Sequence, residues 1–149
     1  MKQGKKGFTL IELLVVIAII GLLSTLSILA LNQARARARD AKRISDVRQI
    51  QTALELYYND SNNYPTTASV TAGAAISSGA NIYLAAVPIP PLPTDGSNCT
   101  AYTTAYTYVR YGAAGTTASY TIQYCLGATV NNITGNAAQT ATPAGIRLP

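Results

Sequence analysis

One long apolar run dominates the first third of the chain. Between residues 8 and 31 the only charged side chain is Glu12, and residues 13–31 contain neither a charge nor a proline. As a helix, residues 13–31 would be about 28 Å long, close to the hydrocarbon thickness of a bilayer. The pattern therefore predicts a membrane helix over residues 8–31. A secretory signal peptide is the alternative, but its apolar region is usually only about 7–15 residues long.

Beyond residue 31 the pattern changes from uniformly apolar to one-sided. Residues 32–58 contain neither Gly nor Pro and are rich in good helix formers. Apolar side chains recur there at three- and four-residue spacing, which predicts a single buried stripe. We expect the helix to continue to residue 58, so that it has a hydrophobic half and an amphipathic half. The members of the stripe are Ala41, Ile44, Val47, Ile50 or Gln51, Leu54 and Tyr57/Tyr58.

The helical pattern stops at a dense group of turn formers over residues 59–66, which includes Tyr64 and Pro65. A proline disfavours helix at the residue before it, so we expect a loop to begin there. Residues 67–98 are rich in Ala, Ser and Gly and then in Pro, which predicts a long connection with one short helix or strand near residues 82–87.

Two later segments alternate apolar and polar side chains with period two, which is typical of strands. They cover residues 102–111 and 119–126, and a hairpin loop is expected between them over residues 112–115. We expect a third strand near residues 128–133, followed by a tail that ends in residues 143–149. The predicted fold class is therefore α+β, with a long N-terminal helix packed on a small antiparallel β-sheet head at residues 59–149.

Charge is scarce and lies mostly in the first third of the chain. Residues 1–50 carry nine Lys or Arg against three Asp or Glu, whereas residues 51–149 carry two against three. The head is rich in Thr, Ala, Ser, Asn and Tyr, which suits exposed β structure outside the cytoplasm. The chain has no histidine and no evident nucleophile–base pair, so we expect neither an enzyme nor a cofactor.

Two features do not fit a plain membrane anchor. Glu12 lies inside the apolar run, where an unpaired carboxylate costs about 2.5–3.5 kcal/mol at the helix centre and less near its end. Either it reaches the lipid headgroups, or it finds a positive partner when the helix packs beside its copies. The second feature is a short basic leader, residues 1–7, in which Lys2, Lys5 and Lys6 precede Gly7. Glycine lets such a backbone extend into a protease cleft.

These features form one ordered motif, Lys5-Lys6-Gly7-Phe8-Thr9-Leu10-Ile11-Glu12 followed by Leu-Leu-Val-Val-Ile-Ala-Ile-Ile-Gly. The motif resembles the class III signal of type IV pilins and type II secretion pseudopilins. The resemblance implies cleavage between Gly7 and Phe8 by a membrane prepilin peptidase, with methylation of the new Phe8 amine. It also implies that Glu12 pairs with the Phe8 amine of a neighbouring subunit in a filament, since a buried charge is tolerable only when paired.

The same resemblance implies partners and a location. The partners would be copies of the chain in a helical filament, the prepilin peptidase, an inner-membrane assembly platform and minor pilins. Before assembly the chain would cross the cytoplasmic membrane once with its head outside the cytoplasm, and afterwards it would lie in an extracellular or periplasmic filament. Gly21 matches a small residue midway along the family's stalk. Many members carry a proline where this chain has Leu29, so we expect the stalk to stay helical there.

A basic cluster follows the apolar run, and it is open to more than one interpretation. DNA contact in a competence pilin is one, because phosphate contacts dominate DNA affinity. A solvated face or inter-subunit ion pairing is the simpler one, so we do not expect nucleic acid as a partner. Counting charges alone favours the reverse orientation in the membrane, whereas the leader motif places the head outside. The cluster consists of Arg35, Arg37, Arg39, Lys42 and Arg43.

Cys99 and Cys125 are the only two cysteines. In an exported domain, two cysteines that flank a hairpin most simply form a disulfide, worth about 3 kcal/mol of loop entropy. Two free buried cysteines are the alternative. We expect no metal site, because two thiols without histidine lack completing ligands. Some major pseudopilins hold calcium in an acidic C-terminal loop, but no Asp or Glu follows Asp95 here.

The sequence thus predicts a structural subunit of a type IV pilus-like or pseudopilus filament, cleaved after Gly7 and assembled through its hydrophobic helix. Secretion pseudopilin and surface pilin both remain open. The alternative from another class is a single-span, membrane-anchored binding domain, whose Tyr- and Thr-rich strands would contact a glycan or a protein.

Overall fold

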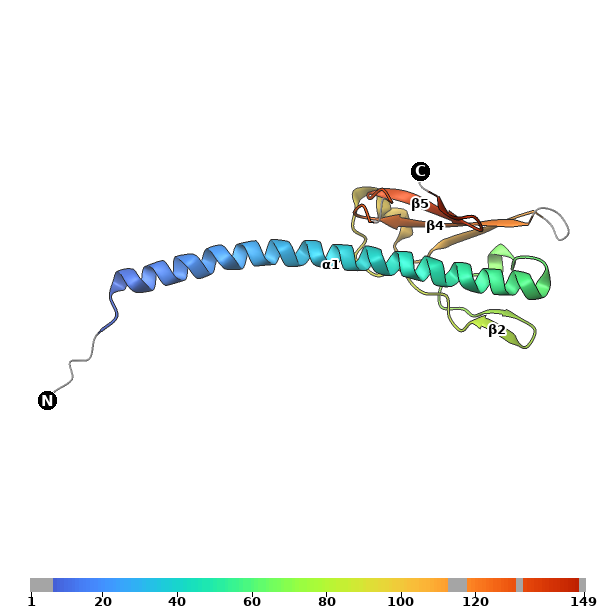
Figure 1. Ribbon diagram of the computed structural model, residues 1–149, viewed down its shortest axis with the longest axis horizontal. Coiled ribbons are helices and arrows are strands. Elements are labelled where there is room, and N and C mark those ends of the chain that lie inside the picture. The colour runs from blue at the N-terminus through green and yellow to red at the C-terminus, as the bar shows by residue number, and fades with distance from the viewer. Residues whose placement is uncertain (1–6, 113–117, 131–132, 148–149) are drawn as a thin grey trace. The chain divides into compact units, whose positions relative to one another are not determined.

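The computed structural model describes residues 7–112, 118–130 and 133–147. Within these residues the chain forms one long α-helix, two short 3-10 helices and six strands (Figure 1). The chain divides into two compact units, residues 1–35 and residues 36–149. The elements are, in chain order, α1 (Leu10–Ser61), η1 (Thr67–Ser69), β1 (Ile76–Ser78), β2 (Asn81–Leu84), η2 (Ser97–Tyr102), β3 (Thr107–Tyr111), β4 (Ser119–Leu126), β5 (Ala137–Thr142) and β6 (Gly145–Arg147).

The predicted long helix is α1, and it runs without a break from Leu10 to Ser61 rather than from residue 8 to residue 58. Leu29 stands in the middle of it, where a proline would have removed a backbone donor. At its end, Asn62 adopts a positive φ of 50°, and its N–H donates to the carbonyl of Tyr58 at 2.7 Å. This left-handed cap satisfies a carbonyl of the last turn and ends the helix.

In the first unit the apolar side chains of α1 are exposed on every side. Each large apolar side chain from Phe8 to Leu31 is between 45% and 83% exposed. By length and composition α1 is able to cross a membrane. The hydroxyls of Ser24, Thr25 and Ser27 each donate to a backbone carbonyl three or four residues earlier, at 2.7 to 2.8 Å. These polar groups are therefore satisfied within the helix, as an apolar environment requires.

The second unit contains a four-stranded antiparallel sheet in the order β3-β4-β5-β6 and a two-stranded hairpin, β1-β2. β4 has the bounds expected from the sequence, and its Ile122 lies opposite Tyr108 of β3. The strand expected over residues 102–111 is shorter than predicted, because residues up to Tyr102 form η2. Residues 113–115 of the expected hairpin loop lie outside the described residues.

The prediction of a third strand near residues 128–133 is wrong. The described part of that segment forms an isolated bridge between Val130 and Ile133. The strand that pairs with β4 is instead β5, and β6 follows where a tail was expected. The sequence of β5, Ala-Ala-Gln-Thr-Ala-Thr, carries no large apolar side chain that would reveal alternation. Its buried positions are the polar Gln139 and the small Ala141, which lies opposite the buried Ile122.

The core of the second unit forms where the amphipathic part of α1 packs on the sheet, of which Figure 1 labels β4 and β5. The predicted stripe of α1 is largely correct, and Ile50 rather than Gln51 continues it. Ala41 was expected in the stripe but is exposed. The buried members on α1 are Ile44, Val47, Ile50 and Leu54. Facing them are side chains from β3, β4 and the residue before β3, namely Tyr106, Tyr108, Tyr120, Ile122, Tyr124 and Leu126. The α+β fold class is thus confirmed.

Buried tyrosines connect the head to carboxylates of α1. The Tyr106 hydroxyl donates to Asp46 at 2.9 Å, and those of Tyr64 and Tyr120 donate to Glu55 at 3.1 and 3.3 Å. Burial, and then the nearby carboxylate charges, raise the pKa of both Tyr106 and Tyr120 well above the ordinary value. The hydroxyls therefore remain protonated, and remain donors, over the whole physiological pH range.

The folded state should consequently lose stability at alkaline pH. An unfolded tyrosine ionises with a pKa of about 10, whereas burial raises the pKa of Tyr124 to about 12. Because the pKa is higher in the folded state, the neutral hydroxyl contributes fully to stability below about pH 10. This contribution is lost as the pH rises toward the folded-state pKa. Urea titration of the detergent-solubilised chain should give a lower free energy of unfolding at about pH 11 than at about pH 8.

Tyr111 provides the control, because it is 53% exposed. The alkaline loss of stability should shrink in Tyr106→Phe and stay unchanged in Tyr111→Phe. Equal losses in the two variants would contradict the role of the buried hydroxyls.

Candidate functional site

The first candidate site is the start of α1, where the expected pairing residue contacts Thr9. The N–H and Oγ1 of Thr9 both donate to Glu12 Oε2, at 2.8 and 2.6 Å, and the N–H of Glu12 donates to Thr9 Oγ1 at 3.3 Å. This reciprocal arrangement is a capping box, in which a Ser or Thr before the first turn and a Glu three residues later satisfy backbone donors. Leu10 is accordingly the first helical residue.

Thr9 is a residue that the sequence interpretation did not single out. The signal was present, because Thr-x-x-Glu directly before an apolar run is typical of a helix start. Its contacts change the picture of Glu12. One carboxylate oxygen is occupied within the chain before any partner arrives, and the negative charge lies at the positive end of the helix dipole. The structure therefore gives Glu12 a local role in starting the helix.

The bond between Gly7 and Phe8 is open to solvent beside this carboxylate. Phe8 is 81% exposed, and a Cβ built at Gly7 would meet no atom within 4 Å. Lys2, Lys5 and Lys6 of the leader lie outside the described residues. An apolar hollow adjoins the carboxylate, and it is lined by Phe8, Ile11, Glu12, Val15 and Val16. The start of α1 thus combines an accessible backbone bond, a carboxylate that is hydrogen-bonded to Thr9 and an apolar surface.

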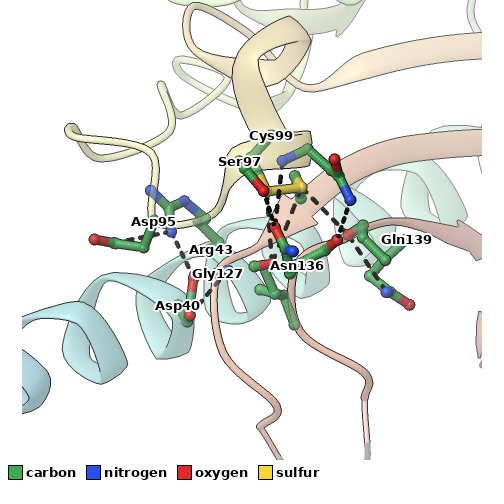
Figure 2. The surroundings of a disulfide bond; sticks show 12 residues. Asp40, Arg43, Asp95, Ser97, Cys99, Gly127, Asn136 and Gln139 are labelled. Carbon is green, nitrogen blue, oxygen red and sulfur yellow. Dashed lines mark hydrogen bonds and ion pairs between the residues drawn. A yellow bond between two sulfur atoms is a disulfide. The ribbon is translucent and has the colours of Figure 1, made fainter.

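The second candidate site is a buried ion cluster in the second unit, where α1 meets two loops (Figure 2). Asp40 is completely buried. Its carboxylate accepts from the backbone N–H of Gly127 at 3.1 Å and of Ala128 at 2.8 Å. Arg43 Nη1 donates to Asp40 Oδ1 at 2.5 Å. The charge of Asp40 is thus balanced and its oxygens are hydrogen-bonded, which burial of a carboxylate requires.

Arg43 also fixes the proline-rich segment that leads to Asp95. Its Nη2 donates to the carbonyl oxygens of Pro91 and Pro93 at 2.8 and 2.9 Å, and its Nη1 lies 3.6 Å from Asp95 Oδ2. Arg39 donates twice to the same carboxylate, at 2.7 and 2.5 Å. The hydrogen bonds from Arg39, and the positive charge of both arginines, hold the pKa of Asp95 below its ordinary value.

The five basic residues of the predicted cluster therefore have different surroundings. Arg39 and Arg43 belong to the ion cluster, and Lys42 pairs at 3.5 Å with a carboxylate one turn along α1. Arg35 and Arg37 are exposed, and neither forms an ion pair within the part of the chain that the structure describes. The cluster is thus divided between structural ion pairs and exposed cations.

A disulfide joins Cys99 of η2 to Cys125 of β4, with Cα atoms 5.4 Å apart. Beside it, Asn136 Oδ1 accepts from the N–H of Asn98 at 3.2 Å and from the hydroxyl of Ser97 at 3.4 Å (Figure 2). The chain is tightly packed here, because a Cβ on Gly127 would overlap the backbone of the segment that ends at η2. These contacts tie η2, β4 and the loop before β5 into one junction.

No three His, Cys, Asp or Glu side chains among residues 7–112, 118–130 and 133–147 are grouped closely enough to hold a metal ion. The positive groups at the buried ion cluster are guanidinium groups of the chain itself. The first candidate site is therefore a charged, capped helix start, and the second is a fixed junction between α1 and the head.

Comparison with known proteins gives matches to a family and to several relatives. Residues 2–28 match the family described as "Prokaryotic N-terminal methylation motif". The chain is 41% identical over 66 residues to type II secretion system core protein G of Aeromonas hydrophila, a match that covers 44% of this chain and 46% of the relative. The protein of the same name from Escherichia coli K12 is 41% identical over 63 residues, which are 42% of this chain and 43% of the relative.

A relative with a different name extends the match. Fimbrial protein EcpC of Eikenella corrodens is 33% identical over 96 residues, which cover 64% of this chain and 61% of that protein. The chain spans less than half the length of the core protein G relatives that it matches. No solved structure matches the chain.

Thr9→Val should loosen the start of α1, because valine keeps the shape of threonine but has no hydroxyl to cap the helix. Loss of such a cap costs about 1 kcal/mol. Amide protons of the first turn should therefore exchange about fivefold faster. Hydrogen exchange followed by NMR on the detergent-solubilised chain measures this. Thr25→Val removes a hydroxyl inside the helix and should leave the first turn unchanged, whereas unchanged exchange in Thr9→Val would contradict the capping role.

Arg43→Met should destabilise the head, because it leaves Asp40 buried without its counter-charge. Removing one partner of a buried ion pair costs about 3 kcal/mol or more. The free energy of unfolding, taken from urea titration and the near-ultraviolet circular dichroism of the tyrosines, should fall by that amount. Arg37→Met is the matched control, and an exposed site should change stability by less than about 0.5 kcal/mol. Similar free energies of unfolding for Arg43→Met and Arg37→Met would mean that the ion cluster does not stabilise the fold.

Proposed function

We propose that this chain is a member of the type IV pilin and type II secretion pseudopilin family and a structural subunit of a filament, on the basis of its methylation motif and its α+β fold. The observation that carries the proposal is the exposed apolar part of α1, before residue 32, which begins with a capped carboxylate. Relatives named as a secretion core protein and as a fimbrial protein support a pseudopilus or a type IV pilus-like filament equally.

The exposed apolar surface of residues 8–31 requires a cover. Apolar surface removed from water contributes roughly 25 cal/mol per Å², so this part of α1 is not stable in water alone. Lipid covers it before assembly, and the same surface on neighbouring copies covers it afterwards. The precursor is thereby divided into a leader at residues 1–7, a membrane and filament-core helix at 8–31, an amphipathic half at 32–58 and a head at 59–149.

The carboxylate at the helix start sets the geometry of assembly. Cleavage after Gly7 creates a positive amine on Phe8, four residues before Glu12. Thr9 occupies Oε2 of that glutamate, and Oε1 has no donor within the described residues. Oε1 therefore receives the Phe8 amine of a neighbouring copy, which compensates the charge when the helix is buried among its copies. Methylation leaves the amine positive.

The location and the partners follow from this cycle. The precursor crosses the cytoplasmic membrane once, with the head outside the cytoplasm, and is cut by a prepilin peptidase. An inner-membrane assembly platform and minor pilins then act on the cleaved subunit. We infer a structural and not a catalytic role, because the grouped charges of the head fix loops to α1 and the chain has no histidine.

The proposal is tested by the N-terminus of the assembled chain. When the chain is produced together with a prepilin peptidase and an assembly system, sheared fibres should contain subunits that begin at a methylated Phe8. Gly7→Val should block cleavage, because a branched side chain fills the space beside the cleaved bond that glycine leaves open to a protease cleft. Gly21→Ala is the matched control, since a Cβ there meets no atom within 4 Å. Mass spectrometry of intact subunits measures both.

Glu12→Gln tests the ion pair separately from cleavage. Glutamine keeps the shape of glutamate and an oxygen that accepts from Thr9, but it has no charge. This variant should be cleaved normally and yield at least tenfold fewer fibres, a loss of about 1.4 kcal/mol or more per contact. Normal fibre yield would contradict the pairing, and an N-terminus other than Phe8 in the unchanged chain would contradict the proposed function.

A further inference from the structure

In the second unit α1 exposes a charged stripe, one end of which contacts the head. Arg37, Arg48 and Glu55 are all exposed. At about 3.6 residues per turn, the spacings between these positions correspond to about three and two turns, so the three side chains lie on one face of α1. Within the described residues, none of the three takes part in an ion pair.

The carboxylate of this stripe is held in place on α1. Tyr64 donates to both oxygens of Glu55, at 3.1 and 3.2 Å, and Tyr120 donates to Oε1 at 3.3 Å. These donors are neutral, so they position the carboxylate without cancelling its charge. Glu55 therefore presents a fixed negative charge at the surface, with the complementary Arg48 on the same face two turns earlier.

We propose that Arg48 of one copy forms an ion pair with Glu55 of the next copy in the filament. The inference rests on the proposed function, which supplies the second copy. In a helical assembly of identical copies every α1 presents the same face to its neighbours, and the proposal assigns the stripe to that face, so that the stripes of successive copies meet one another. Opposite charges at a fixed spacing then select one axial register, because any other register leaves them unpaired.

The two ends of α1 require a similar axial offset between copies. The seven residues from Arg48 to Glu55 correspond to about 10.5 Å of helix rise. If Phe8 continued the helix, pairing of its amine with Glu12 of a neighbour would require an axial offset of about 6 Å between the two copies. The offset rises to about 10 Å because Phe8 and Thr9 precede α1, and residues outside a helix reach up to about 3.5 Å each. In both pairings the copy that supplies the cation is shifted toward the C-terminal end of α1 relative to the copy that supplies the carboxylate.

Arg37 does not satisfy this condition. It shares the face of Glu55, but the 18 residues between them correspond to about 27 Å of helix rise. No pairing at the start of α1 gives such an offset. Arg37 is therefore a control for Arg48, since both are exposed arginines on one stripe at different axial positions.

Cross-linking in fibres tests the register. Arg48→Lys (the 48/55 pair) keeps the positive charge and supplies an amine, and a water-soluble carbodiimide joins an amine to a carboxylate without a spacer, so that only side chains in contact react. In sheared fibres of this variant, coupling to Glu55 of the next copy should give a ladder of covalent multimers on a denaturing gel that the unchanged chain does not give, and adding Glu55→Gln should remove it. Arg37→Lys (the 37/55 pair) should give no such ladder. Fibres are first counted by electron microscopy.

The outcomes separate this inference from the proposed function. Fibres that give no ladder with the 48/55 pair, or a stronger ladder with the 37/55 pair, contradict the register. A chain that forms no fibres even without substitutions contradicts the proposed function itself.

Charge reversal gives a second readout that does not depend on cross-linking. Arg48→Glu places a carboxylate against Glu55 of the next copy and should lower the fibre yield at least tenfold, whereas Arg37→Glu should leave the yield within about twofold. Normal thermal unfolding of both variants in detergent shows that the head remains folded. Equal yields from the two variants would overturn the proposed pairing.

Discussion

The structure depends on one constraint, which is that the apolar side chains of α1 before residue 32 need a cover that the chain itself does not provide. A bilayer or a bundle of identical helices can bury this surface, and neither requires a change in backbone conformation. Glu12 distinguishes them. In lipid its charge is costly, and the capping box with Thr9 lowers that cost without removing the charge. In the bundle that we propose, the charge is paired with the Phe8 amine of a neighbouring copy, and this pairing favours the assembled state over the membrane state.

The head must stay attached to α1 for such an assembly to display it, and two kinds of contact hold it. Apolar packing joins the buried stripe of α1 to the tyrosine-rich face of β4. The ion cluster of Asp40, Arg43 and Asp95 adds specificity, because Asp40 and Arg43 bind particular backbone groups of the two loops. A buried ion pair is weak as a source of net stability. Its role here is to fix the proline-rich segment and the loop after β4 against the same two turns of α1.

Periodicity and local signals were enough to predict the long helix, its buried stripe and β4, since each carries large apolar side chains at regular spacing. They were not enough for β5, whose small side chains give no alternation and whose place is decided by pairing with β4. Nor could they reveal that Asp40 and Arg43 are buried, because their partners are backbone groups distant in the sequence. At the helix start the reverse holds. Thr9 and Glu12 are only three residues apart, so the capping box was readable from the sequence.

The central claim is that α1 leaves lipid to pack among its copies with Glu12 paired to a neighbouring amine. A reconstruction of sheared fibres by electron cryomicroscopy, at a resolution that shows side chains, tests it most directly. The account predicts that residues 8–31 of successive copies form the core of the fibre, and that the Glu12 carboxylate lies within hydrogen-bond distance of the Phe8 amine of a neighbouring copy. Fibres in which these residues face solvent, or in which Glu12 contacts no neighbouring amine, would contradict it.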